Sequence, residues 1–194
     1  MNIIEIGGYD GYNTQKYLNE NDDVCIWVFE PNPIMATELR RKFASNNKII
    51  IIEKAVTDYT GKSKFNILNN QNSCSLHTLT EYGKSSTTLK FKNEIEVDTI
   101  RMDTFIENYN IDTIDFLHCD AQGSDLSILN SFGDKLSILK HGVVEANNSV
   151  RLYDVDNTTK SILKFLSNND FKILNITNVD KMGFDVNIEF KKQF

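Results

Sequence analysis

The sequence predicts an α/β fold whose sheet is mostly parallel and ends in an antiparallel hairpin. A short apolar run at residues 3–6 leads directly into a turn with three glycines at residues 7–11, and a helical pattern follows. Further apolar runs of strand length alternate with helical patterns, as expected for strands joined by helical crossovers. The last two runs, residues 171–176 and 184–190, have no helical pattern between them, so they are expected to pair as a hairpin.

The bulk composition is that of one soluble globular domain. The chain has 194 residues, 40% of them hydrophobic and 25% charged, which is enough to bury a core without disulfides or metals. Its formal net charge of −6 argues against nucleic acid or an anionic membrane as a partner. Cys25, Cys74 and Cys119 are widely separated and read as reduced thiols. No signal peptide or membrane-spanning run is recognisable, so we expect a cytoplasmic protein.

The first half of the chain reads as three strands joined by two helices. The strands are predicted at residues 3–6, 24–29 and 49–52, and the helices at residues 14–19 and 34–44. The second strand is apolar almost throughout, as in a strand that a parallel sheet buries on both faces. Pro31 and Pro33 stop this strand, and Pro33 suits the first turn of the following helix. Right-handed crossovers are expected to place the three strands side by side.

The second half continues the alternation after an irregular segment. Residues 62–68 read as an edge strand, and the polar residues 69–93 read as a loop insertion of the kind that forms a lid or binding loop. Further strands are predicted at residues 94–100, 114–119 and 141–146, and helices at residues 104–109, 126–132 and 158–168. No repeat or boundary divides the chain, so residues 1–194 are expected to form one domain. With the closing hairpin, this order matches a Rossmann-like methyltransferase sheet, whereas dehydrogenases normally keep this part parallel.

Two glutamates at strand ends indicate the kind of cofactor. Glu5 ends the first strand, just before Gly7. In a dinucleotide-binding fold this turn faces a pyrophosphate, which a neighbouring carboxylate would repel. A carboxylate suits a ligand with hydroxyls or an ammonium group, which favours S-adenosylmethionine over NAD. Glu30 ends the second strand, where an acidic residue accepts the hydroxyls of a ribose; NAD enzymes use the same contact, so Glu30 indicates a ribose only.

The candidate catalytic residues also stand at or near strand ends. Asp120 follows the strand at residues 114–119, where it can orient an acceptor hydroxyl, act as a general base or merely cap the next turn. Glu145 ends the following strand, and His118 precedes Asp120, although a histidine in an apolar strand is more often a core residue. Asp120 and Glu145 can share a magnesium ion, but no spacing requires one, so no metal is predicted. His77 is the titratable group of the 69–93 segment suited to base chemistry.

Several segments follow one another in a characteristic order: residues 5–12, 28–33, 55–56 with Gly61, 97–103, 114–123 and Glu145. Taken together, they resemble the FkbM family of S-adenosylmethionine-dependent methyltransferases. The F-E-P-N-P and D-x-x-G segments, at residues 29–33 and 120–123, are the most specific. The resemblance implies transfer of a methyl group from S-adenosylmethionine to an oxygen, typically a hydroxyl of a sugar, glycan or small metabolite.

The resemblance and the strand-end positions together define the expected site. The residues expected to bind the cofactor are Glu5, Gly7, Gly8, Tyr9, Gly11, Glu30, Pro31, Asn32, Ala55, Val56, Asp120 and Gln122. Those expected to act in catalysis are Asp120, His118 and Glu145.

The chain departs from the family pattern in three respects. His118 stands where a lysine is usual and Asp125 where a glutamate is usual, and most members carry a segment ahead of the first strand. These departures leave a non-catalytic cofactor-binding module as the first alternative. An NAD-type oxidoreductase is the second and less favoured alternative. A homodimer is expected if a neighbouring subunit supplies the missing cover.

Overall fold

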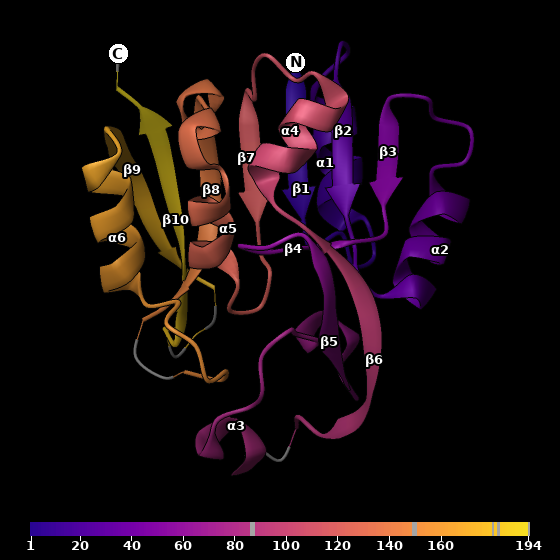
Figure 1. Cartoon of the computed structure of the whole chain (residues 1–194), viewed down its shortest axis with the longest axis vertical. Coiled ribbons are helices and arrows are strands. Elements are labelled where there is room, and N and C mark those ends of the chain that lie inside the picture. The colour runs from indigo at the N-terminus through magenta and orange to yellow at the C-terminus, as the bar shows by residue number, and fades with distance from the viewer. Residues whose placement is uncertain (86–87, 149–150, 180, 182, 194) are drawn as a thin grey trace.

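The centre of the protein is a seven-stranded sheet between two layers of helices (Figure 1). The computed structural model describes residues 1–85, 88–148, 151–179, 181 and 183–193. The sheet has the order β3-β2-β1-β7-β8-β10-β9. Its strands are β1 Asn2–Ile6, β2 Cys25–Phe29, β3 Ile49–Ile52, β7 Phe116–Cys119, β8 His141–Asn147, β9 Phe171–Asn178 and β10 Asp185–Lys192.

The strand directions confirm the predicted fold class. All neighbours from β3 to β8 pair in parallel, and β10 runs antiparallel to both β8 and β9. The C-terminal hairpin is therefore present, but its second strand lies inside the sheet and its first strand forms the edge. This order places the carboxyl ends of β1, β2 and β7 next to one another.

Five of the helices cover the two faces of this sheet (Figure 1). On one face are α1 Tyr12–Glu20 and α2 Pro33–Lys42, and on the other α4 Met102–Tyr109, α5 Asp125–Ser131 and α6 Thr159–Asn168. The alternation of side chains along β1 serves both layers. Ile3 packs with Leu39 of α2, whereas Ile4 packs in the larger core with Phe105 of α4.

A second, three-stranded sheet lies beneath the carboxyl ends of the parallel strands (Figure 1). It consists of β4 Ala55–Val56, β6 Phe91–Ile100 and β5 Gly61–Leu68, in that order. The edge strand predicted at residues 62–68 is thus an edge of this sheet. The predicted 69–93 loop contains a 3-10 turn at Gln71–Ser73, helix α3 Glu81–Ser85 and the start of β6, while its residues 86–87 lie outside the described part. Strand β4, two residues long, was missed because so short a segment has no periodicity.

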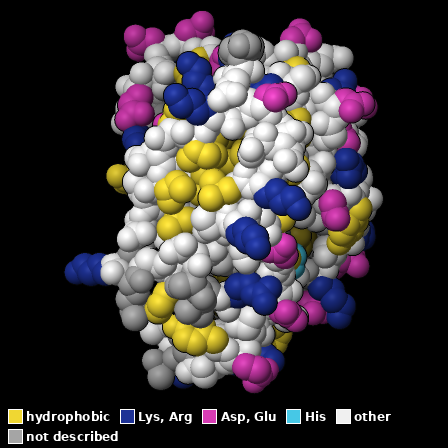
Figure 2. All heavy atoms as spheres, turned by 90° about the vertical axis from the view of Figure 1, so that its left-hand side faces the viewer, with side chains coloured by type: hydrophobic (Ala, Val, Ile, Leu, Met, Phe, Trp, Pro, Cys, Tyr) yellow, Lys and Arg dark blue, Asp and Glu magenta, His cyan; other side chains and the backbone are white. Residues whose placement is uncertain are grey.

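The outer edge of the main sheet is exposed on the side that Figure 2 shows. Leu174 and Ile176 of the edge strand β9 are exposed. Figure 2 shows a hydrophobic patch on this side of the molecule, with charged side chains of both signs around it. Among the described helices, none combines the length and the hydrophobicity that a bilayer crossing requires.

Candidate functional site

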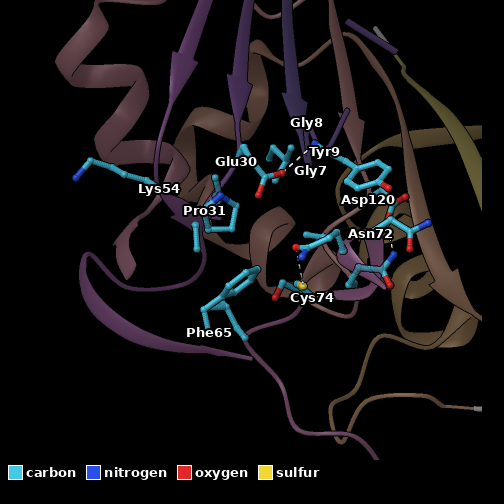
Figure 3. A pocket seen from close by; sticks show the side chains of 18 of the residues that line it. Gly7, Gly8, Tyr9, Glu30, Pro31, Lys54, Phe65, Asn72, Cys74 and Asp120 are labelled. Carbon is cyan, nitrogen blue, oxygen red and sulfur yellow. Dashed lines mark hydrogen bonds between the residues drawn. The ribbon is translucent and has the colours of Figure 1, made fainter. Parts of the chain in front are cut away.

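A cavity opens at the carboxyl ends of β1, β2 and β7, between these strands and the second sheet (Figure 3). Each strand contributes the residues that follow its end: Gly7 to Tyr9 after β1, Glu30 and Pro31 after β2, and Asp120 to Gln122 after β7. Parallel sheets bind ligands at this position because the loops after their strands converge there.

The glycine turn brings the backbone of three strands close together. The amides of Gly7 and Gly8 both donate to the carbonyl oxygen of Phe29, over 3.0 and 3.1 Å. Gly7 has a φ of +92°, and a Cβ at this position would lie 2.0 Å from the carbonyl oxygen of Asp120. Only glycine accepts both the positive φ and the close approach. The turn therefore presents bare backbone to the cavity.

Glu30 is held in place by backbone amides at the edge of the cavity (Figure 3). Its Oε2 accepts from the Tyr9 amide over 2.9 Å, and its Oε1 accepts from the Asn32 amide over 2.8 Å. Burial raises the pKa of this carboxyl, and the two amide hydrogen bonds oppose that shift. Because a carboxylate oxygen can accept more than one hydrogen bond, a fixed Glu30 can still accept both hydroxyls of a ribose.

The opposite wall comes from the second sheet and the segment after it. Phe65 of β5 lines the cavity together with Gln71, Asn72, Cys74 and Leu76. Figure 3 shows Phe65, Asn72 and Cys74 across the cavity from Glu30. None of these residues was singled out from the sequence, although all except Phe65 lie in the 69–93 segment predicted as a lid or binding loop. Nothing in their local sequence distinguishes them from core or loop positions. Ala55 and Val56, which were predicted, also line this end.

Asp120 belongs to a partly buried network of carboxyl groups. Its Oδ1 accepts from Nε2 of Gln122 over 2.7 Å, and the same nitrogen lies 3.3 Å from Oε2 of Glu145. Burial, and then the charges of Asp120 and Asp125, raise the pKa of Glu145 to about 10. Burial and Asp120 likewise raise the pKa of Asp125 to about 7. Burial and the neighbouring carboxyl groups therefore favour the protonated form of Glu145.

Two predicted residues, Glu5 and His118, lie outside this cavity, beneath helix α1. The Thr14 hydroxyl donates to Oε2 of Glu5 over 2.5 Å, and Oε1 has no partner among the described residues. His118 pairs through Nδ1 with the Tyr17 hydroxyl at 2.6 Å, and burial lowers its pKa. The predicted position of His118 at the reaction centre is not supported, because the chain turns into the cavity only after Cys119.

Two further residues that were expected to bind the cofactor are instead the N-caps of helices α1 and α2. Gly11 is the N-cap of α1, where a Cβ would lie 2.7 Å from the ring of Phe43. Asn32 is buried and accepts the Ile34 amide at the start of α2. Neither lines the cavity, whereas the other predicted cofactor residues apart from Glu5 do.

The segment after β5 is fastened to the turn that carries Asp120. Nε2 of His77 lies 3.0 Å from the Ser124 hydroxyl, and the Ser75 hydroxyl donates to the Gln122 carbonyl oxygen over 2.7 Å. Burial lowers the pKa of His77, and the imidazole does not itself line the cavity. Within the described ranges, no three histidine, cysteine or acidic side chains are grouped to hold a metal ion.

Comparison with known proteins assigns the family. The Methyltransferase FkbM domain model matches residues 5–173. The chain is 22% identical over 171 residues to "2-O-methyltransferase NoeI" of Sinorhizobium fredii, covering 84% of this chain and 70% of that protein.

Solved structures with similar folds include M. capricolum TrmK in complex with S-adenosyl-homocysteine, with a TM-score of 0.57 and 12% identity. Aeropyrum pernix fibrillarin with natively bound S-adenosyl-L-methionine gives a TM-score of 0.56 and 12% identity. This chain aligns over 100% and 98% of its length and spans 62% and 65% of those chains. Such distant likenesses show the fold, whereas the family model covers most of the sequence. The chain therefore belongs to the FkbM methyltransferase family.

Proposed function

We propose that this protein transfers the methyl group of S-adenosylmethionine to a hydroxyl of a sugar, glycan or small metabolite. The observation that carries the proposal is the position of Glu30, whose carboxylate is fixed by two backbone amides. It lies beside a glycine turn in which Gly7 closely approaches the backbone of Asp120. Family membership and the similarity to a protein named a 2-O-methyltransferase support oxygen as the acceptor atom.

The cavity residues fit the parts of S-adenosylmethionine. Glu30 would accept the ribose hydroxyls, and the apolar side chains of Val56 and Phe65 would hold the adenine. The amino-acid end would lie along Gly7 and Gly8, towards Asp120. When bound, the cofactor supplies an activated methyl group on its sulfonium.

The carboxyl network would act on the acceptor. A hydroxyl is a weak nucleophile, so a carboxylate that takes its proton during transfer assists the reaction. Asp120 lines the cavity and would take that proton, while Gln122 orients its carboxylate. Because burial favours the protonated form of Glu145, this group would not compete for the acceptor proton. The rest of catalysis would come from positioning the two reactants.

Titration calorimetry with S-adenosylhomocysteine tests the cofactor. We expect micromolar binding by the wild-type protein and a loss of at least about 30-fold in Glu30→Ala, because two charge-assisted hydrogen bonds are removed. The control is Glu20→Ala, an exposed acid on α1, which should bind like the wild type. No binding by folded wild-type protein at millimolar ligand would refute the proposal, and binding of NADH in its place would favour an oxidoreductase.

Phe65→Leu should weaken the same binding by about three- to tenfold. Leucine keeps most of the apolar bulk in the second sheet but removes the flat ring that an adenine can stack on. Phe91→Leu, at an exposed position of the neighbouring strand β6, is the matched control. Equal affinities of Phe65→Leu and the wild type would remove Phe65 from the proposed adenine site.

The alternative of a non-catalytic module loses part of its basis. One of the departures that suggested it, His118, lies outside the cavity and contacts Tyr17. The expected homodimer stays a prediction, which light scattering of the purified protein would test.

A further inference from the structure

Tyr153 joins two segments that meet at the carboxyl network. Its side chain is buried, with 2% exposure, in the chain that follows β8. Around it, the Thr80 amide donates to the Leu152 carbonyl over 2.8 Å and the Asp154 amide to the Thr78 carbonyl over 2.9 Å. Residues 151–155 therefore form an additional short pairing with the segment at residues 70–80 that lines the cavity.

The Tyr153 hydroxyl lies between two acceptors from different parts of the chain. It is 2.6 Å from the carbonyl oxygen of Ser73 and 3.0 Å from Oε1 of Gln122. Ser73 precedes Cys74 in the cavity wall, and Gln122 contacts Asp120. The hydroxyl has one proton, which the two carbonyl oxygens share, so this one group contacts both the wall segment and the carboxyl network.

Gln122 is held in this position with an unfavourable backbone conformation. Its φ is +49°, which is uncommon for a residue other than glycine. The Ser75 hydroxyl donates to its carbonyl oxygen, which fastens the strained turn to the same wall segment. Backbone strain of this kind persists where surrounding contacts determine the conformation, often at functional sites.

Hydrogen-bond directions explain what Tyr153 does to the Gln122 amide. The amide nitrogen faces two carboxyl groups, Asp120 at 2.7 Å and Glu145 at 3.3 Å. The amide oxygen then points to Tyr153 and needs a donor there. Without the hydroxyl, Oε1 would lose this donor, and the amide would be held through its nitrogen alone.

We propose that Tyr153 is a positioning residue for methyl transfer, whose hydroxyl orients the Gln122 amide against Asp120 and Glu145 and fastens residues 70–80 over the cavity. This inference rests on the proposed function. Tyr153 does not line the cavity, so it acts through Gln122 and the wall segment.

The test compares Tyr153→Phe with the wild-type protein, both without cofactor. We expect amide hydrogen exchange of residues 72–80 to become at least tenfold faster in the variant. The side-chain amide resonance of Gln122 in a ¹H–¹⁵N spectrum, assigned by its absence in Gln122→Glu, should also shift. Tyr109→Phe, which removes a hydroxyl from an exposed tyrosine on α4, should change neither signal.

Either signal unchanged in a folded Tyr153→Phe variant would overturn the proposal. If that variant does not fold, the proposal is tested on the wild-type protein by nuclear magnetic resonance of the tyrosine hydroxyl proton. A slowly exchanging tyrosine hydroxyl proton with a nuclear Overhauser contact to the Gln122 side chain is expected, and its absence would equally overturn the proposal. Neither measurement requires cofactor, so a failed titration with S-adenosylhomocysteine would count against the proposed function and not against the contacts of Tyr153.

Discussion

Gly7→Ala is expected to abolish binding of S-adenosylhomocysteine and to lower the free energy of unfolding by about 3 kcal/mol or more. The added Cβ would lie 2.0 Å from the carbonyl oxygen of Asp120, and the backbone φ of +92° is unfavourable for alanine. Neither Gly7 nor Asp120 can move away without shifting the backbone at the end of its strand. The turn must move away from Asp120, and the cavity changes shape with it. Urea unfolding and titration calorimetry measure the two effects.

Gly183→Ala separates the cost of the backbone angle from the cost of the clash. Gly183 has a φ of +66°, but the nearest atoms to an added Cβ are 3.5 Å away, an ordinary contact. We expect this variant to lose only about 1 kcal/mol and to bind S-adenosylhomocysteine like the wild type. A loss of stability in Gly7→Ala as small as that in Gly183→Ala would contradict the close approach of Gly7 to the Asp120 backbone at the cavity.

Glu5→Gln is expected to remove one contribution to the pH dependence of stability. Burial raises the pKa of Glu5 from 4.5 to about 7, so the folded protein holds this proton more tightly than the unfolded chain. The resulting stabilisation is present below about pH 4.5 and is lost as the pH rises through 7. For the wild type, the loss from Glu5 amounts to about 3 kcal/mol at most.

The measurement is the free energy of unfolding of both proteins between pH 5 and pH 8. Asp125 and Glu145 also have raised pKa values and lower the stability of both proteins in the same direction. The informative quantity is therefore the difference in the free energy of unfolding between the wild type and Glu5→Gln. As the pH rises, the wild type should lose more stability than the variant. Glu20→Gln, at an exposed position of the helix α1, should follow the wild type. Parallel curves for wild type and Glu5→Gln would contradict the burial of a titrating Glu5.

Much of the architecture was predictable because its signals are local. The strand at residues 49–52 and the closing hairpin follow from apolar runs and from the short distance between them, and both are present. Glu30 and Gly7 were identifiable because a carboxylate or a glycine directly after a buried strand is a local pattern. These features hold wherever the strands are placed, since they depend on residues close together in the sequence.

The sequence by itself determined the family, the mostly parallel sheet and the residues at the ends of its strands. Only the tertiary structure decided which of those residues face the cavity. Glu5 and His118 stand one and two residues before the cavity residues Ile6 and Asp120, yet both point beneath α1. Likewise, Phe65 and Tyr153 reach the site from segments whose paths depend on the second sheet and on loop contacts. The physical reason is that the direction of a side chain at a strand end depends on what packs above it, and distant segments supply that packing.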